Sequence, residues 1–197
     1  MAHWAPASDA SAARAAARRL YLLFRIGGDR YALDAGDVVE VLGLRVLKQV
    51  PGAPAWVAGM LDRRGVPVPV IDMSQLAGKG AAAAVTSTRL ALVRYGVDAT
   101  DAADAADAGN GGRLLGLILE QATETVHYDP AAFKPYGLDN PGARYLGPVL
   151  SDAQGMVQAV KVADLLPASV RALLYPPQDR GEAHGEPNAV AHHGGQP

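Results

Sequence analysis

The sequence predicts a mainly β protein built from two small closed barrels of roughly five strands each. Short apolar segments alternate with turn residues about every 8 to 12 positions, and no helix-length crossovers separate them. This strand-rich pattern also occurs twice along the chain. Closing each sheet into a barrel removes the exposed strand edges that would otherwise invite aggregation.

The two strand-rich regions align as an internal repeat. Residues 30–42 match 114–126 at an offset of 84 positions, and residues 62–76 match 152–166 at an offset of 90. Loops of unequal length inside matching units explain the two offsets. The alternative is chance similarity between segments that are both rich in Val and Leu.

The elements of the first copy follow from local patterns. Gly27, Gly28 and Asp29 between two apolar runs predict a hairpin, and Asp72 or Ser74 is suited to cap a short helix that ends at Gly78. In chain order we expect a hairpin over 21–34, β-rich segments over 37–44 and 45–50, a turn over 51–61 with at most one helical turn, and a strand over 66–72.

The second copy follows a linker near 77–88. Residues 98–111, an Asp/Ala stretch, bury too little apolar surface to order themselves and are expected to form an expanded hairpin loop. The other expected elements are strands over 88–96 and 113–128, a helical turn over 129–135, and two strands with the start of a helix over 145–166. This organisation predicts a folded region over 20–175, a flexible segment over 1–19 and a disordered tail over 176–197.

Composition and charge exclude several classes of function. Eighteen Lys and Arg against twenty Asp and Glu give a formal charge of -2, which supplies no single-signed field for phosphate backbones or anionic lipids. We expect no nucleic acid partner and no direct membrane insertion. The sequence has no Cys, no apolar run of about 20 residues and no signal-peptide centre, which predicts a soluble cytoplasmic protein without thiol chemistry.

Candidate catalytic and metal sites are weak. Glu40 and Glu124 hold equivalent places in the repeat, but a hydrolase would need the two carboxylates to face one cleft at a separation of about 5 to 9.5 Å. The repeat would more naturally place one on each barrel. His184, His192 and His193 lie in the tail, where nothing fixes a coordination geometry. We expect no catalytic residue, no metal and no cofactor.

Recognition of another protein remains as a function. Val38, Val39 and Val41 flank Glu40, so both faces of that strand are apolar. Either one face packs on the core while the other meets a partner, or the protein buries both faces itself.

Two arginines stand in the turn before the next strand. Arg63 and Arg64 precede Gly65, and arginine is enriched at interface hot spots, although a solvated turn needs no function. Pro67 and Pro69 alternate in the strand that follows and lack backbone donors, which predicts an edge or a barrel corner.

These residues resemble the CheW-like domain of bacterial chemotaxis coupling proteins. The resemblance covers about Leu22 to Leu174, and its most distinctive segment is RGVPVPVID, which follows a P-x-W-V-x-G turn. It implies two five-stranded SH3-like barrels, in agreement with the repeat, and a non-enzymatic adaptor. Such an adaptor links the cytoplasmic tip of a chemoreceptor to the regulatory domain of a CheA-type histidine kinase. The receptor tip is expected as a helical hairpin in a groove between the barrels.

The resemblance also implies binding residues. Arg64 matches the Arg of an Asn-x-Arg-Gly turn associated with receptor coupling, Val38, Glu40 and Val41 match the strand that borders the groove, and Gly59 matches the Gly that lets the turn pack. An adaptor of a surface-sensing pathway, controlling a diguanylate cyclase or motility, is the alternative within this class.

The sequence departs from the family pattern at four places. Asp62 replaces the Asn of the turn, Arg89 stands where an apolar strand residue is usual, Pro67 is an additional proline, and the 98–111 loop is longer. We include Arg89 among the expected binding residues. These departures concern the choice of partner more than the fold.

Overall fold

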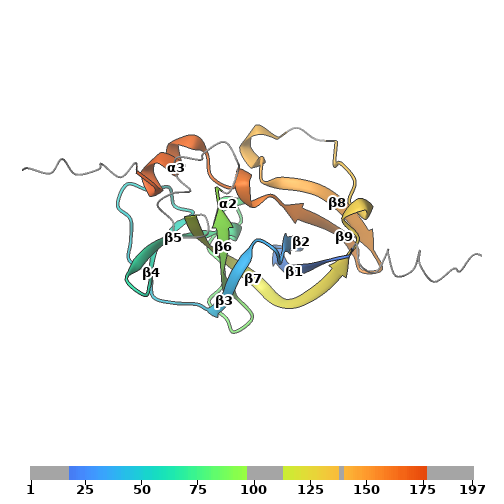
Figure 1. The fold of residues 1–197 in the computed structure, drawn as a ribbon, viewed down its shortest axis with the longest axis horizontal. Coiled ribbons are helices and arrows are strands. Elements are labelled where there is room, and N and C mark those ends of the chain that lie inside the picture. The colour runs from blue at the N-terminus through green and yellow to red at the C-terminus, as the bar shows by residue number, and fades with distance from the viewer. Residues whose placement is uncertain (1–17, 97–112, 138–139, 177–197) are drawn as a thin grey trace, which may run out of the picture.

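The computed structural model describes residues 18–96, 113–137 and 140–176 (Figure 1). The strands are β1 (Arg19–Ile26), β2 (Asp29–Asp34), β3 (Val38–Gly43), β4 (Val57–Arg63), β5 (Val66–Asp72), β6 (Arg89–Tyr95), β7 (Arg113–Tyr128), β8 (Leu146–Asp152) and β9 (Gly155–Val160). The helices are α2 (Met73–Leu76) and α3 (Ala168–Leu174), with short 3-10 helices η1 (Pro130–Ala132), η2 (Pro141–Ala143) and η3 (Val162–Asp164). No helix in these three ranges combines the length and apolar character needed to cross a membrane.

Three sequence predictions concern segments largely outside these ranges. The Asp/Ala loop at 98–111 lies outside the described residues, as do nearly all of the 1–19 segment and of the 176–197 tail with its histidines. They stay predictions.

The strands form two five-stranded sheets that share β7. The first barrel has the order β3-β6-β7-β5-β4, and the second has the order β7-β1-β2-β9-β8. Figure 1 shows the first barrel on the left and the second on the right. The predicted mainly β architecture of two five-stranded units is therefore confirmed.

Strand β7 changes barrels at its midpoint. Its residues 113–119 pair with β6, whereas Glu120 and the following residues pair with β1. The register shifts at the change, and Gln121 takes a left-handed backbone with a φ of 50°. A bulge of this kind bends a strand sharply, and the bend lets one continuous strand serve two sheets.

The repeat unit of the sequence is not the barrel. The first copy crosses from the second barrel to the first between β2 and β3, and the aligned part of the second copy, β7, crosses in the opposite direction. The β4–β5 hairpin corresponds to the β8–β9 hairpin. Each barrel is thus assembled from strands of both copies.

The largest core cluster joins the barrels. Leu22, Phe24 and Ile26 of β1 point into it together with Ile71 and Leu117 of the first barrel. Tyr21 and Leu23, on the other face of β1, pack inside the second barrel. The period-two alternation of β1 therefore serves two cores, which explains why its sequence is apolar almost throughout.

Some of the local secondary-structure predictions are confirmed and others are wrong. The hairpin over 21–34 and the helical turn after Asp129 are confirmed, and Asp72 caps α2 by accepting hydrogen bonds from the backbone N–H groups of Ser74 and Gln75. The β-rich prediction for 45–50 is wrong, and so is the second half of the turn predicted over 51–61, where β4 begins at Val57. Within 45–50, only Lys48 forms a β-bridge, with Met60 of β4, because the segment passes over Gly59 and then turns at Pro51.

The two prolines of β5 lie where the strand has one neighbour. Residues 66–69 pair with β4 alone, whereas β7 pairs with Val70, Ile71 and Asp72. Pro67 and Pro69 consequently sit in an edge portion of the strand, as predicted from their missing donors.

Candidate functional site

The β4–β5 turn presents Arg64 in a strained conformation. Arg63 pairs with Val66, so the loop consists of Arg64 and Gly65, with φ values of 55° and 84°. The Asp62 carboxylate accepts a 2.7 Å hydrogen bond from the Gly65 N–H. Two positive φ angles define the tight hairpin turn that favours Asn-Gly, and arginine in the left-handed region costs about 1 kcal/mol.

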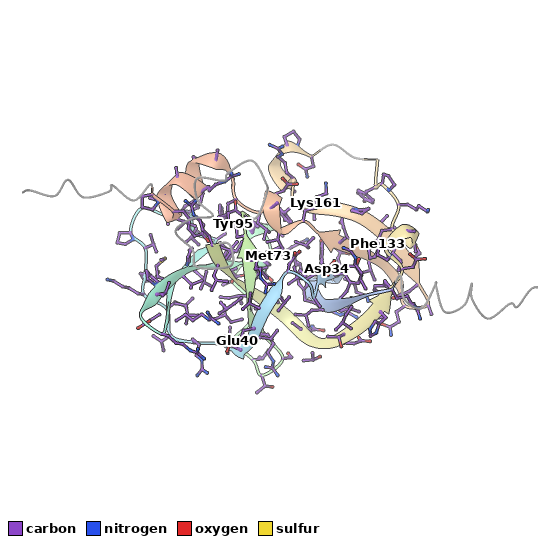
Figure 2. The ribbon with its side chains drawn as sticks, in the orientation of Figure 1. Asp34, Glu40, Met73, Tyr95, Phe133 and Lys161 are labelled. Carbon is purple, nitrogen blue, oxygen red and sulfur yellow. The ribbon has the colours of Figure 1, made fainter. Side chains whose placement is uncertain are left out.

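The neighbouring Arg63 connects this turn to β3. Its Nη2 lies 3.3 Å from Oε2 of Glu40, and its Nε lies 3.4 Å from the same oxygen. Figure 2 places Glu40 at the lower rim of the first barrel. Arg64 is exposed and makes no hydrogen bond or ion pair with any residue that the structure describes. The two adjacent arginines therefore differ, because Arg63 is paired within the fold whereas Arg64 can bind a partner.

Strand β3 has one inward and one outward face. Val38 packs against the shared core, whereas Val39 and Val41 are 37% and 44% exposed. Leu44 and Val46, just beyond the strand, are 36% and 98% exposed. We call these four exposed side chains the apolar strip. Of the two possibilities left by the sequence, the structure supports an outward apolar face.

Two predicted binding residues have structural roles in this geometry. Gly59 has a φ of 144°, and a Cβ at this position would lie 2.6 Å from the carbonyl oxygen of Lys48, so only glycine allows the close approach. The guanidinium of Arg89 donates to the backbone carbonyls of Thr86 and Thr88 in the linker before β6.

The second barrel contains the repeat equivalent of this corner. Asp152, aligned with Asp62, begins the β8–β9 turn and accepts a hydrogen bond from the Gln154 N–H. Arg30 binds the Asp152 carboxylate with both terminal nitrogens, at 2.7 and 3.0 Å, and the Tyr128 hydroxyl donates to it at 2.6 Å. Sequence reasoning missed Arg30 and Tyr128, since only the alignment of Asp152 drew attention to this place.

The charges of this cluster perturb one another. The Arg30 guanidinium holds the pKa of the Asp152 carboxyl well below its usual range. Burial and the hydrogen bond to Asp152 raise the pKa of Tyr128 to about 12. The Asp152 carboxylate accepts hydrogen bonds from both Arg30 and Tyr128, so the three side chains tie β2, β7 and the β8–β9 turn together. We call this cluster the clasp.

The hydrolase alternative has no geometric basis. Glu124 lines a pocket of about 240 Å³ in the second barrel with Arg30 and Asp152, and Glu40 does not belong to it. The carboxylate of Glu40 is instead paired with Arg63 in the first barrel. Over the described ranges, no three His, Cys, Asp or Glu side chains gather as metal ligands would.

Comparison with known proteins shows a family. The model of the CheW-like domain matches residues 20–170. Protein FrzA of Myxococcus xanthus is 33% identical over 81 residues, which are 41% of this chain and 51% of FrzA. The chemotaxis protein CheW of Klebsiella aerogenes is 21% identical over 115 residues, 58% of this chain and 60% of that protein. The chain spans about half the length of the curated relatives it matches.

A solved structure shares the fold. The scaffolding protein TtCheW from Thermoanaerobacter tengcongensis superposes with a TM-score of 0.63 at 20% identity, over 85% of this chain and 93% of that one. The prediction of two SH3-like barrels is thereby confirmed.

Proposed function

Because this chain belongs to the CheW-like domain family, whose members are non-enzymatic scaffold and adaptor proteins of chemotaxis signalling, we propose that it couples chemoreceptors to a CheA-type histidine kinase. Family membership also agrees with the prediction that the chain is not an enzyme. Its action would rest on binding energy and geometry alone.

One observation supports the receptor side of this proposal above all others. Arg64 occupies a left-handed position that Asn or Gly would fill with less strain, and it makes no contact that stabilises the fold. A strained, exposed arginine in a barrel that also carries an exposed apolar strip offers the charge and the apolar surface that a charged, amphipathic partner requires. We assign the receptor tip, as a helical hairpin, to this surface.

The predicted binding residues take distinct roles in this proposal. Arg64 and Val41 touch the receptor, while Glu40 acts through Arg63 by fixing the turn to β3. The other three predicted residues support this surface without touching the receptor. Val38 packs on the core, Gly59 allows the close approach of the Lys48 backbone, and Arg89 binds the carbonyls of the linker. The kinase regulatory domain is assigned to the barrel ends, and the adaptor would reside in the cytoplasm, held at receptor arrays by its partners.

Co-purification tests the proposal directly. The full chain, carrying an affinity tag, is expressed in its own host, and its partners are identified by mass spectrometry. We expect a chemoreceptor and a CheA-type kinase in stoichiometric amounts. Recovery of neither protein from a host that expresses both would overturn the coupling function.

A second pathway fits the same chemistry. One relative at 33% identity is named FrzA rather than CheW. The two names leave room for CheW-like adaptors in more than one pathway. In an adaptor of surface sensing, deletion of the gene would alter cyclic diguanylate levels or movement on surfaces and leave swimming chemotaxis intact. Loss of swimming chemotaxis alone would exclude this candidate.

A further inference from the structure

The second half of β7 has an open strand edge. Over residues 120–128 its ladder partner is β1, whereas the first half of β7 lies between β6 and β5. Beyond that ladder, the described residues give this half one further backbone hydrogen bond, from the Ala122 N–H to the Ser87 carbonyl. An edge of this kind leaves a row of backbone donors and acceptors without partners.

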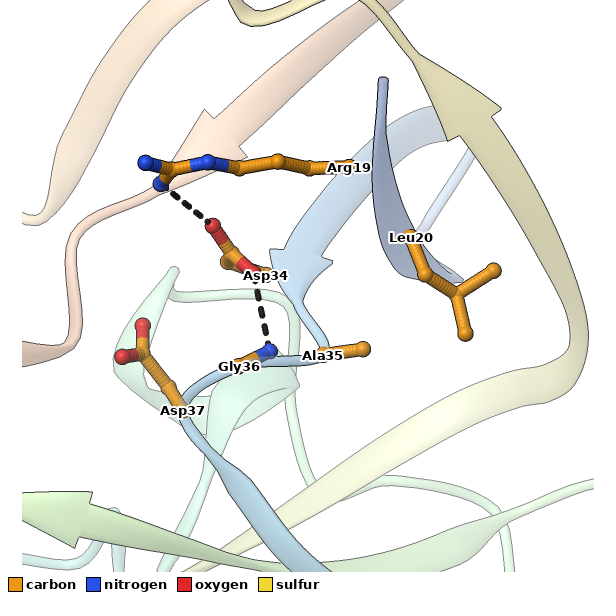
Figure 3. Close-up of a pocket in the computed structure, with 6 residues that line it drawn as sticks. All are labelled: Arg19, Leu20, Asp34, Ala35, Gly36 and Asp37. Atoms are coloured by element: carbon orange, nitrogen blue, oxygen red, sulfur yellow. Dashed lines mark hydrogen bonds and ion pairs between the residues drawn. The ribbon is translucent and has the colours of Figure 1, made fainter. Parts of the chain in front are cut away.

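The pleat of β1 shows which groups of β7 lie on the open side. The Leu20 carbonyl accepts a 2.9 Å hydrogen bond from the Ala35 N–H, so the backbone groups of Leu20 point to the β2 side. Figure 3 shows both residues on the wall of an open hollow of about 510 Å³, together with Arg19 and Asp37. Because successive residues of a strand point their backbone groups to opposite sides, those of Tyr21 point to β7.

Four backbone groups of β7 therefore face outward. Tyr21 pairs with Val126, whose N–H and C=O consequently point to β1. The N–H and C=O groups of its neighbours, Thr125 and His127, point to the open side, and no hydrogen bond from the described residues reaches them. Both side chains are exposed, and the stretch 123–127 contains no Lys or Pro of the kind that protects natural edges.

Open space lies along this edge. The pocket of about 240 Å³ in the second barrel is lined by Glu124, Val126, His127 and Tyr128, which belong to this half of β7. A strand placed against the edge would therefore have room for a side chain beside Val126.

We propose that two copies of this chain associate through their β7 edges as an antiparallel pair, with the two-fold axis between their Val126 residues. In this register Thr125 of each copy lies opposite His127 of the other, so all four outward groups of each copy find partners. The edge is complementary to itself because each copy offers the same donors and acceptors in reverse order.

Charge favours this register over its neighbours. Glu124 lies opposite Tyr128 of the second copy, and the pocket there also contains Arg18, which adjoins Arg19, the β1 partner of Tyr128. A register with Thr125 opposite itself would bring the two Glu124 carboxylates to diagonal positions, and a further shift would place them directly opposite each other. Like charges that face each other across strands are destabilising.

The contact is small, because each copy contributes one short strand. Association is therefore expected to be weak and to depend on protein concentration. It goes beyond the proposed coupling function and does not rest on it, since it requires no partner other than the chain itself.

Disulfide trapping tests the register. The chain has no cysteine, so each variant carries a single thiol. In Val126→Cys the two Cα atoms would lie about 4.5 Å apart, which a disulfide can span. Thr123→Cys, exposed on the same strand, is the matched control, because its two copies would lie about 20 Å apart along the strands. After mild oxidation we expect at least about fivefold more covalent dimer from Val126→Cys on non-reducing gels.

Sedimentation equilibrium measures association of the full chain without a cross-link. The weight-average mass of the native chain should rise toward that of a dimer as the concentration is raised to about 1 mM. Thr125→Pro removes one outward N–H that β1 does not use, so it should keep the fold in a thermal melt and weaken association about tenfold. Thr125→Lys keeps the backbone unchanged, and it should also weaken association because a lysine protects an edge.

Three results would overturn the proposal. They are equal trapping of the two Cys variants, a native chain that stays monomeric over the whole concentration series, and undiminished association of folded Thr125→Lys. Capture of an extended peptide at this edge by a monomeric chain would assign the edge to another protein. Each of these results leaves the coupling function untouched, because receptor co-purification is measured separately.

Discussion

Arg63 joins the β4–β5 turn to Glu40 of β3, whereas the adjacent Arg64 is exposed and forms no ion pair with the residues that the structure describes. Arg63 and Glu40 are 23 positions apart in the sequence, and their contact closes one side of the first barrel. This corner therefore contributes to folding through Arg63 and Glu40, and to the proposed binding through Arg64.

Arg64→Glu should weaken receptor binding and leave the fold intact. Reversal of an exposed charge at an interface centre is expected to lower affinity more than fivefold, whereas the melting temperature should stay within a few degrees of the native value. A pull-down with a receptor fragment and a thermal melt measure the two effects, with Lys161→Glu in the second barrel as control. An unchanged pull-down, or a melt lowered further, would contradict the role of Arg64.

Arg64→Asn should stabilise the protein while weakening receptor binding. Asn tolerates the left-handed conformation, so the free energy of unfolding is expected to rise by up to about 1 kcal/mol in urea titrations. Arg64→Ala is the matched control, because it removes the same guanidinium and keeps the strain. If Asn and Ala gave equal stability, the turn would not be strained by arginine.

Gly59→Ala should destabilise the first barrel. The new Cβ would lie 2.6 Å from the Lys48 carbonyl oxygen, which is backbone and has little room to move. We expect a loss of about 2 kcal/mol or more in the free energy of unfolding. Gly52→Ala is the control, since Gly52 also has a positive φ but has no atom within 4 Å of the added Cβ. If the free energy of unfolding fell no more in Gly59→Ala than in Gly52→Ala, this explanation would be wrong.

Stability should fall in acid through Asp152. Its pKa is lowered in the folded state, chiefly by Arg30, so the unfolded chain binds the proton more readily. The stabilisation is therefore complete above the unfolded value of about 4 and is lost as the pH drops below it. Urea midpoints between about pH 6 and pH 2 should decline less steeply in Asp152→Asn than in the native protein. The control Asp29→Asn should keep the native slope, and a native slope in Asp152→Asn would argue against the clasp.

Local patterns explain how much could be foreseen. The β1–β2 hairpin, the Asp72 cap and the edge position of the prolines depend on residues close in sequence, and glycine, capping and proline rules apply to them directly. The prediction for 45–50 failed because a strand needs a neighbour along its whole length, and β4 offers one only at Met60. Arg89 is an unusual residue type for its strand position, and its guanidinium is bound to the linker before β6.

The sequence by itself determined the mainly β class and the repeat, since apolar alternation and turn spacing follow directly from the order of the residues. Only the tertiary structure decided that the two copies exchange strands, that Arg63 rather than Arg64 binds Glu40, and that Arg30 reaches Asp152 across 122 positions. It alone brought Asp37 into one hollow with Arg19. Such pairings depend on strand register and on barrel closure, which are properties of the whole chain and not of any local segment.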